Sequence, residues 1–139
     1  MIKAILIDDE PASRNGLEKL ISTFTEGITV VASVGSVVEG VRAIRSHQPD
    51  VVFLDIEMPG KDGFALLTSV DEINFDVIFT TAHEQYAVQA FHTTAVDYLL
   101  KPISPDELKN ALSKLQHKQG AVKGNNFKAY IDNLSGQDD

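Results

Sequence analysis

Five short runs rich in β-branched and other apolar residues recur along the 139 residues, separated by segments with helical spacing. The runs are KAILID (3–8), ITVVASV (28–34), VVFLD (51–55), DVIFTT (76–81) and AVDYLL (95–100). Their apolar positions are mostly continuous, which is typical of strands buried on both faces of a parallel sheet. The pattern predicts a (βα)5 chain, a doubly wound α/β fold with helices on both faces of the sheet.

Helix-capping signals indicate where the intervening helices begin. Pro11 suits the first turn of a helix, and two capping boxes, Ser36 with Glu39 and Ser104 with Glu107, open two others. Apolar residues at helical spacing are expected to face the sheet. They are Leu17, Leu20, Ile21 and Phe24; Phe64, Leu66, Leu67 and Val70; Ala87, Ala90 and Phe91 in a short helix over 84–91; and Leu108, Ala111, Leu112 and Leu115.

Composition excludes several classes of function. The chain has no cysteine, which rules out disulfides and cysteine metal sites. No apolar run approaches the roughly 18 residues of a membrane span, and acidic residues follow the N-terminus too early for a signal peptide. We therefore expect a cytoplasmic protein without a membrane segment. A net charge of −8 disfavours nucleic-acid binding by this chain but suits a divalent cation or a basic partner.

The character of the sequence changes after about residue 117. We predict one domain over 1–117 and a linker or tail over 118–139, which contains several glycines. Apolar residues in the tail do fall at helical spacing (Phe127, Tyr130, Ile131 and Leu134). The tail is therefore either a flexible segment with a few apolar residues or a short helix that leads to a further domain.

Polar side chains cluster where the predicted strands end. In an open α/β sheet, ligands bind at the carboxyl ends of the strands. The polar residues at these ends are Asp8, Asp9, Glu10, Asp55, Glu57, Thr80, Thr81, His83 and Lys101. Three aspartates from two adjacent strands would repel one another unless a cation neutralised them, and oxygen ligands alone favour Mg²⁺. With Lys101 and the hydroxyl of Thr81, they describe a site that receives a phosphoryl group on Asp55.

Each of these residues also has a simpler explanation. An aspartate such as Asp55 often only ends a strand, and the pair Asp8 and Asp9 could cap the following helix. Thr81 could satisfy a turn, and a lysine such as Lys101 is usually exposed. The combination favours function, because all five residues fall at strand ends with the spacing of successive βα units.

Four motifs carry a resemblance to a known family: IDDE near the N-terminus, LDIEMPGKDG in the middle, then TTAH and DYLLKP. Together they resemble the receiver domain of bacterial two-component response regulators, over roughly residues 2–117. The resemblance implies a flavodoxin-like sheet of order 2-1-3-4-5. It also implies a phospho-acceptor that takes part in its own phosphorylation and dephosphorylation, instead of an enzyme with an external substrate.

The resemblance assigns a role to each strand-end residue. Asp55 matches the phospho-acceptor, Asp8 and Asp9 match the acidic pair that holds Mg²⁺, and the backbone carbonyl of Glu57 would be a further ligand. Thr81, in preference to its neighbour Thr80, matches the switch hydroxyl, because the small residue Ala82 follows it.

Two further positions complete the implied site. Lys101 matches the lysine that pairs with the phosphoryl group, with a cis bond to Pro102. Tyr98 matches an aromatic switch that faces in or out according to Thr81.

The implied partner is a sensor histidine kinase. Phosphorylation would reshape the face formed by segment 84–91, the strand over 95–100 and the last helix, and a homodimer could form there. Val88, Gln89 and His92 are candidate contacts on this face, together with the polar side of the last helix.

Within the family, the segment TTAHEQYAVQAFHTTAVDYLLKPIS resembles that of the LytTR subfamily of response regulators. Members of that subfamily carry a C-terminal DNA-binding domain, so DNA binding would require a domain absent from this chain.

Glu57 and His83 lie two residues after Asp55 and Thr81, respectively. Both are expected at the mouth of the site, where they would tune the lifetime of the phosphoryl group by blocking or positioning the hydrolytic water. The alternative is that both are simply exposed loop residues.

Two other classes of protein share part of the pattern. A haloacid-dehalogenase-like phosphatase also uses a strand-end aspartate, and Glu57 stands where its general acid would be, but Asp8 and Asp9 fit that class poorly. A flavodoxin-like cofactor module would need a phosphate-binding loop where this chain has acidic residues.

Overall fold

The computed structural model describes residues 1–58, 63–70, 72–83 and 97–118. Its strands are β1 (Ile2–Ile7), β2 (Ile28–Val34), β3 (Val51–Asp55), β4 (Asp76–Thr81) and β5 (Asp97–Leu100). Its helices are α1 (Pro11–Phe24), α2 (Val37–His47), α3 (Gly63–Ser69) and α5 (Pro105–Lys118). All the strand pairs are parallel, and the order β2-β1-β3-β4-β5 confirms the predicted doubly wound, flavodoxin-like sheet.

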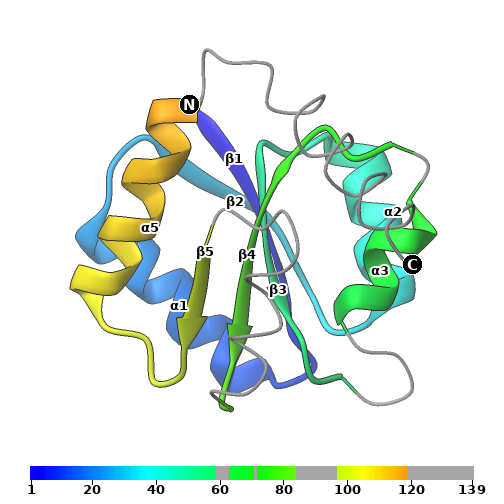
Figure 1. The fold of residues 1–139 in the computed structure, drawn as a ribbon, viewed down its shortest axis with the longest axis horizontal. Coiled ribbons are helices and arrows are strands. Elements are labelled where there is room, and N and C mark those ends of the chain that lie inside the picture. The colour runs from blue at the N-terminus through cyan, green and yellow to red at the C-terminus, as the bar shows by residue number, and fades with distance from the viewer. Residues whose placement is uncertain (59–62, 71, 84–96, 119–139) are drawn as a thin grey trace, which may run out of the picture.

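The sheet lies between two layers of helices (Figure 1): α1 and α5 cover one face, and α2 and α3 cover the other. Successive residues of a strand point to opposite faces. Ile5 and Leu54 therefore join the core on the α2–α3 side, whereas Leu6 and Phe53 join the core on the α1–α5 side. All five residues of β3 are buried. This central strand fixes the position of its last residue, Asp55, at the carboxyl edge of the sheet.

Burial differs between the central and the edge strands. Every residue of β3 and β4 is buried, as the continuous apolar runs predict. In the edge strand β2, six of seven residues are only half-buried and the other is exposed. Its apolar residues still pack against both cores, Val31 and Val34 on the α2–α3 side and Ile28 and Val30 on the α1–α5 side. The expectation of burial on both faces is therefore confirmed only in part for β2, because an edge strand has a neighbouring strand on one side only.

Both predicted capping boxes are present. The hydroxyl of Ser36 accepts the amide of Glu39 at 3.1 Å and donates to its carboxylate at 3.1 Å. Ser104 makes the same pair of hydrogen bonds with Glu107, at 3.2 and 3.0 Å. These bonds satisfy amides at the first turns of α2 and α5 and fix where each helix begins.

Phe24 does not face the core as its helical spacing predicts. Leu17 and Ile21 are buried, but Phe24 is 43% exposed and the ammonium of Lys109 lies 5.9 Å from its ring centroid. The reason is position: Phe24 is the last residue of α1, where the chain turns away toward β2.

Several predictions concern residues outside the described part of the chain. They are the helix over 84–91, the first two residues of the strand over 95–100, the candidate contacts Val88, Gln89 and His92, and the tail beyond Lys118. The side chain of Phe64 is also outside it. Among the helices of the described segments, none has the length and apolar character that a membrane span requires.

Candidate functional site

The predicted strand-end residues meet at one edge of the sheet. Asp55 ends β3, and its Cα is paired with that of Thr80 in β4. Asp8 and Asp9 follow β1, which pairs with β3 on its other side. Lys101 follows β5, and its amide donates to the backbone oxygen of Thr81 at 2.8 Å. The parallel register therefore brings these residues together although they are far apart in the sequence.

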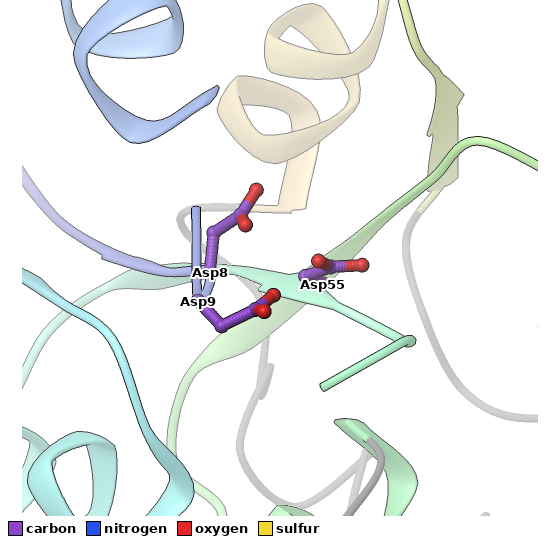
Figure 2. A group of neighbouring side chains, drawn as sticks. All are labelled: Asp8, Asp9 and Asp55. Carbon is purple, nitrogen blue, oxygen red and sulfur yellow. The ribbon is translucent and has the colours of Figure 1, made fainter. Parts of the chain in front are cut away.

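Three carboxylates converge on one point at this edge. Each of Asp8, Asp9 and Asp55 offers an oxygen, and these oxygens all lie within 4.8 Å of one another. Figure 2 shows the side chain of Asp9 extending from the turn after β1 toward Asp55. Asp8 and Asp55 are buried, and Asp9 is half-buried. A compact set of carboxylate oxygens fits a hard divalent cation such as Mg²⁺.

Lys101 supplies a positive charge to the same cluster. Its Nζ lies 2.8 Å from Oδ2 of Asp8 and 3.5 Å from Oδ2 of Asp55. The side chain of Lys101 is 19% exposed, so water screens these contacts little. The ammonium is thus a counter-ion shared by two buried carboxylates, not the exposed lysine of the simpler explanation.

The site perturbs the protonation of its members unequally. Burial raises the pKa of Asp55 to about 6, because the lowering by the amide of Glu57 and by the charge of Lys101 is smaller. Burial also opposes ionisation of Asp8, but hydrogen bonds from Lys101 and the amide of Glu10 hold its pKa below the ordinary value. Burial disfavours the ammonium of Lys101, yet its contacts with Asp8 and Asp55 raise its pKa. Of these three groups, Asp55 is therefore the one whose charged form is disfavoured in the folded protein.

The aspartates also stabilise the turns that follow their strands. Oδ1 of Asp55 accepts the amide of Glu57 at 3.0 Å, and Oδ1 of Asp8 accepts the amide of Glu10 at 2.9 Å. The residue that caps α1 is Glu10, which makes no capping hydrogen bond through its side chain. The simpler explanation is thus correct for Asp55, which forms the turn that ends its strand, whereas the proposed capping of α1 by Asp8 and Asp9 is wrong, because Glu10 is the capping residue. In both Asp8 and Asp55 the other carboxylate oxygen faces Lys101.

Thr81 ends β4 next to Lys101, and Tyr98 lies in the neighbouring strand β5, paired with Phe79. Thr81 is fully buried, and its hydroxyl accepts the amide of His83 at 3.0 Å. Tyr98 is half-buried and packs against the core on the α2–α3 side of the sheet. The bond between Lys101 and Pro102 is cis, as the resemblance implied.

The side chains of Glu57 and His83 form a pair that joins the turns after β3 and β4, close to Asp55 and Thr81. Nε2 of His83 lies 3.3 Å from Oε2 of Glu57, and the two side chains are 51% and 38% exposed. The sequence predicts that both lie here. It does not predict that they contact each other, because they belong to different loops, after β3 and after β4.

Arg14 is a residue of this region that the sequence reasoning missed. Its Nη1 donates to the backbone oxygen of Asp8 at 2.6 Å, and its Nε donates to the hydroxyl of Ser33 at 3.1 Å. A signal was present: Arg14 lies in the helix that begins directly after the acidic cluster, one turn beyond Glu10.

Comparison with protein families matches the response regulator receiver domain to residues 4–113. This range includes every strand-end residue described above, and the chain belongs to this family. The assignment favours a receiver over the two alternatives, a haloacid-dehalogenase-like phosphatase and a flavodoxin-like cofactor module.

Curated relatives support the same assignment. The chain is 43% identical to an uncharacterized response regulatory protein of Vibrio vulnificus over 116 residues, 83% of this chain and 48% of that protein. It is 38% identical to the transcriptional regulatory protein BtsR of Escherichia coli K12 over 120 residues, 86% of this chain and 50% of BtsR. The chain thus spans about half the length of these relatives.

Solved structures share the fold. The receiver (REC) domain of AraT, a response regulator from Geobacillus stearothermophilus, aligns with a TM-score of 0.74 at 31% identity, over 86% of this chain and 95% of that one. The response regulatory domain of MrkE from Klebsiella pneumoniae aligns with a TM-score of 0.71 at 30% identity, over 84% and 96%.

Proposed function

We propose that this receiver accepts a phosphoryl group on Asp55 from the phosphohistidine of a sensor histidine kinase. The observation that carries the proposal is the convergence of three carboxylates around the ammonium of Lys101 at the carboxyl edge of the sheet. A site built for a neutral ligand would not concentrate so many charges at one buried point. An incoming phosphoryl group and a cation can instead use all of them.

The transfer exchanges one bond to phosphorus for another. An oxygen of Asp55 attacks in line, the new O–P bond forms as the N–P bond of the donor breaks, and the electron pair stays on the donor imidazole. With a pKa of about 6, Asp55 is largely ionised at neutral pH and can act as the nucleophile. Lys101 lies close enough to pair with a phosphoryl oxygen, and Thr81 can donate its hydroxyl to another.

Asp8, Asp9 and Asp55 are the side chains that would hold Mg²⁺, together with the backbone carbonyl of Glu57. The ion, when bound, would supply positive charge to the phosphoryl oxygens. Before phosphorylation, the ammonium of Lys101 already offsets part of the repulsion between Asp8 and Asp55.

A two-state change at Thr81 and Tyr98 would carry the signal outward. When Thr81 turns to bond the phosphoryl group, it must give up the amide of His83, and the ring of Tyr98 can move inward. The affected face includes β5 and α5, and we propose that a homodimer forms through it.

The output we propose is transcriptional control through a C-terminal LytTR-type DNA-binding domain. Two facts support it: the chain spans about half of its curated relatives, and one of them, BtsR, is named a transcriptional regulatory protein. Residues 118–139 would then be the linker. The family assignment supports a location in the cytoplasm, and no role for a membrane is proposed.

Intact-mass measurement after incubation with acetyl phosphate and Mg²⁺ tests the acceptor. The wild-type chain should gain the mass of one phosphoryl group, and Asp55→Asn should gain none. Asp76→Asn is a matched control, because Asp76 is also buried but starts β4 at the opposite edge of the sheet. An unlabelled wild type would contradict the proposal, and labelling of Asp55→Asn would move the acceptor elsewhere.

Glu57 and His83 should act on the lifetime of the phosphoryl group as one unit. Glu57→Ala and His83→Ala should each speed its hydrolysis about 2- to 10-fold, the rate equivalent of one lost hydrogen bond. The double variant should be no faster than either single one, because each change already opens the pair. The measurement is the decay of the labelled protein, with His47→Ala, exposed at the opposite edge, as the control. Unchanged decay in both single variants would refute the role.

A further inference from the structure

The guanidinium of Arg14 joins the carboxyl ends of two strands. One nitrogen donates to the backbone oxygen of Asp8, after β1, and another donates to the hydroxyl of Ser33, in β2. The same two strand ends are also linked by the amide of Asp8, which donates to the backbone oxygen of Val34 at 3.1 Å. Arg14 is half-buried. Its guanidinium is held between the two acceptors by these hydrogen bonds.

The contact with Asp8 restrains the next residue, Asp9. The peptide bond between them is planar, so a fixed carbonyl of Asp8 fixes the plane that also contains the amide nitrogen and Cα of Asp9. The carboxylate of Asp8 has restraints of its own, from Lys101 and from the amide of Glu10. None of the described residues hydrogen-bonds to the carboxylate of Asp9. Its direction toward Asp55 therefore depends on its backbone, and thus on Arg14.

Gly35 leaves room for this arrangement. A Cβ at position 35 would lie 3.0 Å from Nη1 of Arg14 and 3.8 Å from the backbone oxygen of Asp8. Any larger residue would press on the guanidinium where it meets Asp8. The sequence thus provides the donor, both acceptors and the space between them.

We propose that Arg14 is a positioning residue for Mg²⁺: through the peptide plane between Asp8 and Asp9, it aims the carboxylate of Asp9 at the cation. The inference rests on the proposed function, because it assumes that this carboxylate cluster binds Mg²⁺. Arginine is required instead of lysine, since a single ammonium cannot span both acceptors with a fixed geometry.

The test compares Arg14→Lys, which keeps the charge, with Arg14→Gln, which removes it. Arg42→Gln is the matched control, because Arg42 is exposed on α2. The dissociation constant of Mg²⁺ is measured by calorimetry, and the backbone amide signal of Asp9 is followed by NMR in the metal-free protein. Disturbing residues that orient metal ligands typically weakens binding 10- to 100-fold. We expect about tenfold weaker binding in both Arg14 variants, a shifted Asp9 amide, and wild-type behaviour in Arg42→Gln.

The outcomes distinguish a positioning role of Arg14 from an effect of its charge alone and from a failure of the variants to fold. Wild-type affinity in Arg14→Lys would overturn the proposal, because charge alone would then suffice. If the Arg14 variants fail to fold, Ser33→Ala removes one acceptor and leaves Arg14 in place. Wild-type affinity and an unshifted Asp9 amide in Ser33→Ala would overturn it as well. A wild-type chain that binds no Mg²⁺ would refute the proposed function instead, and the metal-free Asp9 signal would still report on Arg14.

Discussion

Replacing Asp55 with asparagine should raise the free energy of unfolding of the metal-free protein by about 2 to 3 kcal/mol near pH 8. The reason is that burial raises the pKa of Asp55 to about 6, from an ordinary value of 3.8. At pH 8 the folded protein must hold this carboxylate ionised at a site where it is 3% exposed. An asparagine of the same shape can still accept the amide of Glu57 and carries no charge.

The pH dependence follows from the direction of the shift. Because the folded state binds the proton of Asp55 more tightly than the unfolded chain does, the stabilising contribution of this group is complete below about pH 4. It is lost as the pH rises through about 6, the pKa in the folded state. The advantage of Asp55→Asn should therefore be greatest above about pH 7 and should disappear near pH 4.

Urea unfolding in EDTA, at several pH values, measures this difference. Excess Mg²⁺ should narrow or reverse it, since an ion that binds only the folded wild type stabilises that protein by mass action. If Asp55→Asn were less stable than the wild type at pH 8 in EDTA, Asp55 would not be the carboxyl group whose ionisation destabilises the folded protein.

Much of this site could be predicted because the ends of the strands can be recognised locally in the sequence, whereas the order of the strands came from the resemblance to receiver domains. Apolar runs define the strands, and each run stops at a polar residue. In a parallel sheet, the carboxyl ends of neighbouring strands share one edge. That reasoning places Asp8, Asp55, Thr81 and Lys101 together without any knowledge of side-chain geometry. The turn-forming role of an aspartate and its place in a charged site were predicted as alternatives, and for Asp55 the structure has both.

The sequence could not predict contacts between side chains of different loops, contacts of side chains with backbone atoms, or the exposure of a residue at the end of a helix. The contact between Glu57 and His83 joins two loops whose conformations no periodicity determines. The two acceptors of Arg14 include a backbone oxygen, which no residue type identifies. Phe24 has the helical spacing of a core residue, but spacing does not reveal that α1 stops there.

Replacing Lys101 with methionine should have the opposite effect to Asp55→Asn. We expect a loss of about 3 kcal/mol in the free energy of unfolding of the metal-free protein near pH 8, because removing one partner leaves buried charges uncompensated. Two carboxylates lose their counter-ion at once: Asp8, at 2.8 Å, and Asp55, at 3.5 Å. The loss should shrink on acidification below about pH 6, since a protonated Asp55 no longer needs the ammonium.

Lys114→Met is the matched control for this measurement. Lys114 pairs with Asp97 at 2.9 Å, but its side chain is 47% exposed, and an exposed pair contributes about 1 kcal/mol at most. Lys101→Met should also cost less in the Asp55→Asn background, because only Asp8 then loses its counter-ion. Excess Mg²⁺ should recover part of the loss, since a cation at the carboxylates replaces the missing charge. Equal destabilisation by Lys101→Met and Lys114→Met in EDTA near pH 8 would show that the ammonium of Lys101 does not hold the cluster together.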